Sequence, residues 1–318
     1  LLLNEAKQAN RLKPQISHSA KKMTKLSRRV FLGSAPAAAA AAGVFGTLFS
    51  SAAEAAINWD DTYNVIVIGA GGAGLSAAVS AKEAGCKKVV VLEKMMFAGG
   101  NTIRAGGGFN AAIKADYEKA GIKDSPDLHA QQTLAAGDGR GDPVLVHQLT
   151  EKAPESVQWL KDHSVKFEDH IYQIYAGLYK RARNPIGPRG GAYIKALLEV
   201  CKKEDIPILY NTRVVEIIRE HQLSGRVLGV KVEQKGGKTL YLRALNGVVA
   251  AAGGFAANDR LTAIHDPRMG QLGTTNHPGA TGDVLIDLVD IGAGTRGLDY
   301  IQCIPGGVPG AKHALNLF

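Results

Sequence analysis

The stretch Tyr63–Gly74, YNVIVIGAGGAG, decides the fold of this chain. Its first half is a continuous apolar run, typical of a strand that is buried on both faces of a parallel sheet. Its second half reads G-x-G-x-x-G and leads into a helical stretch from Leu75 to Ala84. Gly69 permits a tight turn, Gly71 lets a pyrophosphate approach the backbone, and Gly74 lets the helix pack closely on the strand. The stretch therefore predicts a strand–turn–helix site for a dinucleotide.

A second apolar run, Lys88–Leu92, predicts a neighbouring strand that ends at Glu93, 24 residues after Gly69. An acid at this place accepts hydrogen bonds from a ribose 2′-hydroxyl and disfavours the 2′-phosphate of NADP. Two such strands around a helix predict an α/β fold, with a Rossmann-like dinucleotide-binding domain on a parallel central sheet. The motif alone does not separate FAD from NAD.

The formal net charge of +9 is concentrated near the N-terminus. Residues 1–30 hold eight Lys or Arg and one acid, whereas the chain from Ala56 onward holds 30 basic and 27 acidic residues. A basic tail on a nearly neutral body is typical of a targeting segment. We therefore expect no nucleic-acid partner.

The three cysteines, Cys86, Cys201 and Cys303, stand far apart in the sequence. They form no C-x-x-C pair and no C-x-x-C-H haem-attachment motif, and their odd number gives no support for a disulfide framework. We predict no metal site, and we expect any redox chemistry to come from a bound cofactor.

Residues 1–55 have the pattern of an export segment. Arg28 and Arg29 lie in S-R-R-V-F-L, an uncharged run follows from Val30 to Phe49, and Ala53–Ala55 offers an A-x-A cleavage site. This pattern predicts export to the periplasm by the twin-arginine route, without stable membrane insertion. The alternative is an N-terminal membrane anchor, because the uncharged run is about twenty residues long.

The segment Lys94–Ala111, KMMFAGGNTIRAGGGFNA, resembles the G-G-N-[ST]-x-x-A-x-G-G-x-N-A segment of the fumarate reductase flavoproteins. In that family the segment wraps the ribityl chain and pyrophosphate of FAD, so the resemblance implies FAD as the cofactor. The related membrane-bound succinate dehydrogenases carry a His that bonds covalently to FAD where this chain has Asn101. The resemblance therefore implies that FAD is held non-covalently.

Further segments match the same family in chain order. Trp159–Phe167 resembles a helix-then-strand segment, Pro188–Gly191 a glycine turn near the flavin, Ile208–Val215 the strand that reaches the adenine, and Gly247–Phe255 a strand end that closes on the dinucleotide. The cofactor-binding residues that the fingerprint and the resemblance together imply are Gly69, Gly71, Gly72, Ala73, Gly74, Glu93, Lys94, Gly99, Gly100, Asn101, Thr102, Gly106, Gly107, Val215, Ala252, Gly253 and Asp283.

The most specific match is Thr274–Asp283, TTNHPGATGD. In the fumarate-reductase-like enzymes the corresponding His binds a substrate carboxylate, and the T-G-D turn contacts the flavin side of the site. The resemblance therefore implies His277 and Asp290 as the catalytic candidates, with Asp290 in the place of a Glu and serving in proton relay.

Three departures from the family pattern concern the substrate. Val284 replaces the last Gly of T-G-D-G, Asp290 replaces the Glu, and Gln302–Gly306 reads QCIPG where the succinate and fumarate enzymes have Q-x-H-P-T. The loss of that His removes a polar group from the active-site side. These changes argue for an unsaturated acid other than fumarate.

The resemblance implies an FAD-dependent oxidoreductase that reduces the C=C bond of an α,β-unsaturated carboxylate. A separate periplasmic donor, such as a c-type cytochrome, would supply the electrons. One alternative is a dehydrogenase or oxidase of the same fold acting on an amino acid or a ketosteroid; the other is a non-catalytic gene fragment.

The family's catalytic arginine and final FAD segment would come after Phe318, so we expect an N-terminal fragment. We divide it into a signal segment (1–55), an FAD-binding domain (56–271) and the start of a capping domain (272–318).

The export interpretation predicts the fate of the double variant Arg28→Lys, Arg29→Lys. Because the twin-arginine route reads both guanidinium groups, this variant should stay in the cytoplasm at precursor length. Fractionation with immunoblotting measures this, and the parent chain is the control. Normal periplasmic accumulation of the variant would make the pattern a coincidence.

Overall fold

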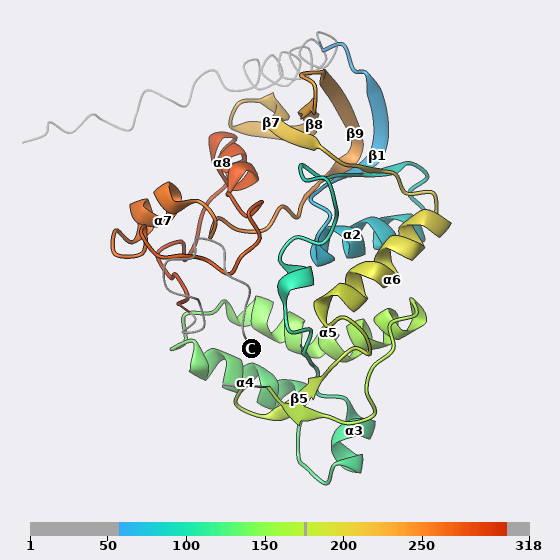
Figure 1. Ribbon diagram of the computed structural model, residues 1–318, viewed down its shortest axis with the longest axis vertical. Helices are drawn as coiled ribbons and strands as arrows, with labels where there is room; N and C mark the ends of the chain where they lie inside the picture. The colour runs from blue at the N-terminus through green and yellow to red at the C-terminus, as the bar shows by residue number, and fades with distance from the viewer. Residues whose placement is uncertain (1–56, 175–176, 304–318) are drawn as a thin grey trace, which may run out of the picture. The chain divides into compact units, whose positions relative to one another are not determined.

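A computed structural model describes residues 57–174 and 177–303 (Figure 1). Three of the sequence predictions lie outside the described residues: the pair Arg28 and Arg29, the Ala53–Ala55 site, and the last three residues of Gln302–Gly306. Among the helices of the described segments, none combines the length and the apolar character that a membrane span requires.

A six-stranded sheet forms the centre of the described chain. Its spatial order is β6 (Ile208–Leu209), β2 (Val89–Leu92), β1 (Asp61–Ile68), β9 (Thr239–Ala250), β8 (Ser224–Gln234) and β7 (Thr212–His221). The first four strands are parallel neighbours, and β8 and β7 continue the sheet as antiparallel strands. The α/β fold class with a parallel-rich central sheet is therefore confirmed.

One predicted strand is interrupted. Ile208–Val215 was expected to be continuous, but the structure divides it into β6 and the start of β7. The break falls at Asn211, whose φ of +50° lies in the left-handed region. Asn tolerates this conformation better than most residues, so the chain can turn there from the parallel part of the sheet into the antiparallel part.

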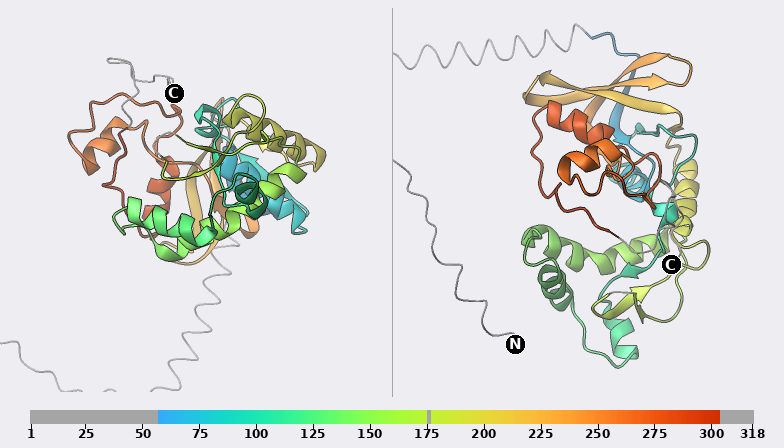
Figure 2. Two further views of the ribbon diagram at one scale, coloured as in Figure 1. Left: turned by 90° about the horizontal axis from the view of Figure 1, so that it is seen from below. Right: turned by 60° about the vertical axis from the view of Figure 1, so that its left-hand side comes forward.

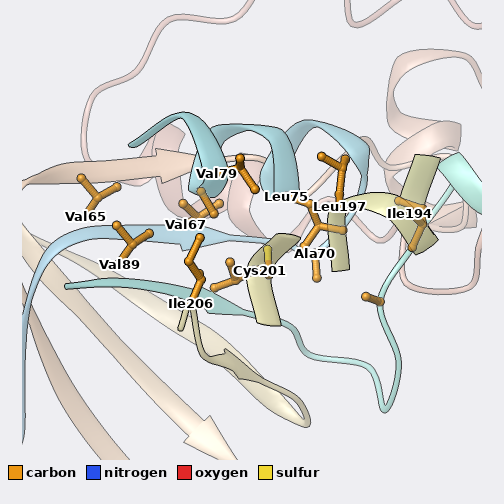
Figure 3. Close-up of a cluster of buried hydrophobic side chains, with 13 residues drawn as sticks. Val65, Val67, Ala70, Leu75, Val79, Val89, Ile194, Leu197, Cys201 and Ile206 are labelled. Carbon is orange, nitrogen blue, oxygen red and sulfur yellow. The ribbon is translucent and has the colours of Figure 1, made fainter. Parts of the chain in front are cut away.

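The two faces of β1 build two different cores. Val65 and Val67 pack with α2 (Gly72–Glu83) and α6 (Gly190–Lys203), and Figure 3 shows side chains of both helices against the strands. Ile66 and Ile68 point the other way and pack with residues of β7 and β8. Since side chains alternate along a strand, a continuous apolar run is what a strand covered on both faces requires.

The remaining elements surround this centre (Figures 1 and 2). A small antiparallel sheet has the order β3 (Phe109–Asn110), β5 (Lys180–Arg183), β4 (Tyr172–Gln173). The other helical elements are η1 (Thr102–Arg104), α3 (Lys114–Lys119), α4 (Pro126–Ala136), α5 (Pro143–Asp162), α7 (Asp259–His265) and α8 (Asp283–Asp290). Helix α5 packs on α4, and α8 lies against β7.

A buried ion pair joins the small sheet to the helices beside it. Arg181 donates two hydrogen bonds, of 3.0 and 2.7 Å, to the carboxylate of Asp124, and both residues are buried. This arrangement satisfies both groups, as burial of charge demands.

The predicted strand within Trp159–Phe167 is reduced to a single bridge between Phe167 and Pro185.

Gly74 allows the closest contact between β1 and α2. A Cβ atom at this position would lie 1.8 Å from the carbonyl oxygen of Gly69, far inside any tolerated contact. Gly74 therefore packs against the turn that follows β1, where only glycine leaves enough room.

We expect Gly74→Ala to lower the free energy of unfolding by about 3 kcal/mol or more, because neither backbone segment can move without disturbing the core. The matched control is Gly294→Ala, where an added Cβ meets no atom within 4 Å. Thermal unfolding of both variants measures the difference. Equal melting temperatures for the two variants would contradict the packing argument.

Candidate functional site

A cavity of about 250 Å³ opens at the carboxyl ends of β1, β2 and β9. This edge of a parallel sheet is where open α/β folds bind ligands. The residues around the cavity come from four segments: the glycine turn, the stretch after β2, the start of β7, and the loops after β9. They are Ile68, Gly69, Gly71, Gly72, Ala73, Leu92, Glu93, Lys94, Met95, Phe97, Gly100, Asn101, Thr102, Thr212, Arg213, Val214, Ala251, Ala252, Gly253, His277, Gly279, Ala280, Gly282, Asp283 and Val284.

Two glycines of the turn serve different purposes. Gly69 has a φ of +103°, and a Cβ there would lie 2.5 Å from the carbonyl oxygen of Ala251, so the fold itself demands glycine. At Gly71 the nearest atom to an added Cβ is 3.8 Å away, and it is the carbonyl oxygen of Gly99. Packing therefore leaves Gly71 open toward the cavity, as the close approach of a pyrophosphate requires.

Glu93 follows β2 and is only 8% exposed. Its Oε2 accepts a hydrogen bond from the backbone N–H of Ala70 at 2.9 Å, and its Oε1 accepts one from the N–H of Met95 at 2.9 Å. These two bonds fix the carboxylate at the wall of the cavity. A carboxylate has about four acceptor positions, so it retains the capacity to accept ribose hydroxyl groups. The glycine turn and Glu93 both fit a dinucleotide.

A charged cluster of Lys94, Arg213 and Asp283 lines the same cavity as the glycine turn. Lys94 Nζ donates to Thr281 Oγ1 at 2.6 Å and to Asp283 Oδ2 at 3.0 Å. Arg213 Nε lies 3.3 Å from the same carboxylate oxygen, and Thr281 Oγ1 donates to Asp283 Oδ1 at 2.7 Å. The cluster ties the start of α8 to the ends of β2 and β6–β7.

The pKa of Asp283 reflects this cluster. Burial by itself raises the pKa, but the hydrogen bonds from Thr281 and Lys94 and the charges of Lys94 and Arg213 outweigh it. The pKa of Asp283 therefore lies below its ordinary value, and the carboxylate is ionised at neutral pH.

His277 is 5% exposed and lines the same cavity as Glu93 and Lys94. Its Nδ1 accepts the backbone N–H of Gly279 at 3.0 Å, so the neutral ring carries its proton on Nε2. Burial lowers the pKa of His277, and the charges of Arg104 and Lys94 lower it further against the opposing effect of Glu93. The ring is therefore neutral at pH 7 and has one N–H to donate.

The structure brings most of the predicted cofactor residues to the cavity. Those that line it are Gly69, Gly71, Gly72, Ala73, Glu93, Lys94, Gly100, Asn101, Thr102, Ala252, Gly253 and Asp283, together with the candidate His277. Gly74, Gly99, Gly106, Gly107 and Val215 lie outside the lining. Val214 lines it instead of Val215, because adjacent side chains of a strand point to opposite faces.

Three of the predicted glycines outside the lining are required by packing. A Cβ on Gly99 would lie 2.3 Å from Ile103 Cγ2, and one on Gly107 would lie 2.8 Å from the backbone carbon of Arg189. The third is Gly74, described above. These glycines shape the wall behind the cavity.

The structure does not bring Asp290 to the cavity. It is the last residue of α8 and is exposed, whereas the cavity is lined by residues of the first turn of that helix. The acid on the buried side of α8 is Asp287, whose pKa is raised by burial and by the nearby charges of Asp283 and Asp290. The proton-relay role of Asp290 stays a prediction without support from its position.

Sequence reasoning missed several residues of the lining, including Phe97, Thr212 and Arg213. Each lies within a segment that the resemblance had matched, Lys94–Ala111 or Ile208–Val215. The matched segments could therefore have indicated these residues as part of the site. The departure Val284 lines the cavity, and its buried side chain also packs in the core of Ile66, Ile68 and residues of β7 and β8. Valine there adds apolar contact to the packing of α8.

One group of metal-ligand type occurs among the described residues, at Asp127, His147 and Glu151. Their ligand atoms lie within 4.8 Å of one another on α4 and α5, away from the cavity lining. Asp127 lies in the first turn of α4, and His147 and Glu151 are one helical turn apart.

Comparison with known proteins identifies the family of the chain. Residues 64–317 match the family model described as the FAD binding domain. The chain is 36% identical over 246 residues to the NADH:fumarate oxidoreductase of Klebsiella pneumoniae, covering 77% of this chain and 26% of that protein. It is 32% identical over 292 residues to the acrylate reductase flavoprotein subunit of Shewanella woodyi, covering 89% and 57%.

A solved structure also resembles this chain. The open conformation of a flavocytochrome c3 fumarate reductase superposes with a TM-score of 0.70 and 30% identity, covering 77% of this chain and 43% of that one. The chain thus spans between about a quarter and somewhat more than half of the length of these similar proteins.

The lowered pKa of Asp283 predicts a pH-dependent contribution to stability. Since the folded-state pKa is below the unfolded one, the carboxylate contributes stability above about pH 4, and this is lost as the pH falls through the folded-state pKa. Asp283→Asn should therefore lower the free energy of unfolding at pH 7 by about 1 kcal/mol and by less at pH 3.

Urea unfolding at pH 7, 5 and 3 measures this difference. The exposed Asp169→Asn change is the control for a general charge effect. An Asp283→Asn effect that is the same at all three values would show that the ion pair with Lys94 does not stabilise the fold.

Proposed function

The chain belongs to the succinate dehydrogenase/fumarate reductase family of FAD-binding flavoproteins, and from that premise we propose that it is part of a reductase for a small α,β-unsaturated carboxylate. One observation carries the proposal: the segment Thr274–Asp283 lies in the same cavity as the dinucleotide fingerprint. A group that can hold a substrate carboxylate, His277, thus stands beside the groups that hold the cofactor.

The described residues fit FAD. Gly71 leaves room for the pyrophosphate, Glu93 retains acceptor positions for a ribose, and Lys94 carries positive charge beside the turn. When bound, FAD supplies the hydride for reduction of a C=C bond. We propose that it is held non-covalently, because the amide of Asn101 cannot form a covalent bond to the flavin as a histidine does.

The role of His277 is to donate a hydrogen bond to the substrate carboxylate. Gly279 fixes Nδ1 as an acceptor, which leaves the proton on Nε2 for the substrate. Low exposure strengthens a hydrogen bond of this kind, because water does not compete for the anion. The neighbouring cations Arg104 and Lys94 also favour an anion near the ring.

Three finer assignments complete the proposal. The substrate is an unsaturated acid other than fumarate, because Val284 and Gln302–Gly306 depart from the pattern of the fumarate enzymes. The electron donor is a separate periplasmic protein, such as a c-type cytochrome. The location is the periplasm, which the twin-arginine pattern at Arg28 and Arg29 supports.

Reduced methyl viologen and a panel of acids test this function in the intact, FAD-loaded protein. We expect FAD-dependent oxidation of the dye by at least one of fumarate, acrylate, methacrylate and an aryl-substituted acrylate, with fumarate not the best. Dye reduction by amino acids or 3-ketosteroids, with no acid reduced, would instead establish the dehydrogenase alternative.

The variant His277→Ala sharpens the same experiment. It should keep its FAD content and lose kcat/KM equivalent to about 2–4 kcal/mol, because a donor to the charged group is missing. The exposed His221→Ala is the control. Lost FAD or lost stability would show that the ring only braces the turn at Gly279, and unchanged kcat/KM would remove it from the site.

A further inference from the structure

Three hydrogen bonds tie the stretch after β2 to the segment that carries His277. The backbone N–H of His277 donates to Asn101 Oδ1 at 2.6 Å, and Asn101 Nδ2 donates to Asn276 Oδ1 at 2.8 Å. Arg104 Nη1 donates to the carbonyl oxygen of Thr275 at 3.0 Å. Three consecutive residues of one segment are thus held by two side chains of another, about 170 positions earlier in the chain.

The orientation of the Asn101 amide is determined by its partners. A backbone N–H can only donate, so Oδ1 must face His277 and Nδ2 must face Asn276. Asn276 is oriented in turn, because its Nδ2 donates to Thr274 Oγ1 at 3.0 Å. Only an amide at position 101 satisfies both partners at once.

The other end of this connection is fixed to the dinucleotide turn. Thr102 Oγ1 accepts the N–H of Gly72 at 3.0 Å, and the N–H of Gly99 donates to the carbonyl oxygen of Ala70 at 2.9 Å. Asn101 lies between these two anchors. Its side chain therefore moves with the backbone that would contact the pyrophosphate.

The ring of His277 follows its own backbone. Besides the bond between Nδ1 and the N–H of Gly279, the carbonyl oxygen of His277 accepts the N–H of Ala280 at 2.9 Å. The ring nitrogen Nδ1 and the carbonyl oxygen of His277 are thus both engaged within one local turn, and its N–H is engaged by Asn101. A shift of the backbone N–H would rotate the ring relative to the cavity.

We propose that Asn101 is a positioning residue: its amide holds His277, through the backbone N–H, in register with the dinucleotide turn. The Asn101 amide thereby links His277, on the side of the cavity proposed for the substrate, to the turn on the side proposed for the cofactor. Its effect on catalysis rests on the function proposed for His277, whereas its effect on the backbone does not.

Amide hydrogen exchange of the intact protein tests the backbone effect directly. In Asn101→Ala, exchange at the His277 amide should become about five- to ten-fold faster, the loss expected for one hydrogen bond. Asn101→Asp retains an acceptor and should keep the slow exchange at His277. The control is Asn64→Ala, which removes a comparable acceptor for the backbone N–H of Lys88 and should leave His277 unchanged.

Unchanged exchange at His277 in Asn101→Ala would overturn the proposal, as would an equal acceleration in Asn64→Ala. So would FAD loss in Asn101→Ala with exchange at His277 unaltered, because Asn101 would then act only as a cofactor contact.

Kinetics separates this proposal from the function of His277. With FAD content unchanged, Asn101→Ala should raise KM for the reducible acid about five-fold. Faster exchange with unaltered KM and kcat would support the positioning of the backbone and contradict the substrate role of His277. Slow exchange retained in Asn101→Ala contradicts the positioning role, whatever the kinetics show.

Discussion

The steric contact of three backbone segments at Gly69 and Gly74 is the constraint on which the rest of the structure depends. The turn after β1 touches the start of α2 on one side and the backbone after β9 on the other, at distances that leave no room for a Cβ atom. The carboxyl ends of β1 and β9 are thereby held together, and the helix N-terminus is aimed at the space between them. The cavity is the space beyond this contact.

The polar groups around the cavity form two sets, and the positions of both depend on that contact. Glu93 is held by the backbone N–H of Ala70 in the turn and by that of Met95 just after β2, so its position follows from the ends of β1 and β2. The Lys94–Asp283 pair and the Asn101 amide then attach the segment Thr274–Asp283, which is remote in sequence. The first set, Glu93, lies next to the glycine turn. The second set holds the segment Thr274–Asp283 beside that turn, although the segment is about 200 residues away in the sequence.

The parts that could be predicted from the sequence are those encoded locally. The strands β1 and β2, the turn and Glu93 each have a pattern of their own, and the matched segments located most of the cavity. The break at Asn211 and the strands of the small sheet were not located, because β3 and β5 pair across more than 70 residues and β5 reads KRAR, a charged sequence typical of a surface. Asp290 was placed by the resemblance alone. It is two helical turns beyond Asp283, so the length of α8 carries it about 10 Å away from the cavity-lining first turn.

The position of β1 in the sheet has a consequence during synthesis on the ribosome. One neighbour of β1, strand β2, follows it within about 30 residues, but the other, β9, is translated only near residue 250. At 5 to 20 residues per second, the intervening stretch takes roughly 10 to 30 s to emerge. For that time β1, a largely apolar strand, has one edge without its native partner, which is a template for pairing with other chains. The nascent protein is therefore most open to mispairing before the last parallel strand arrives.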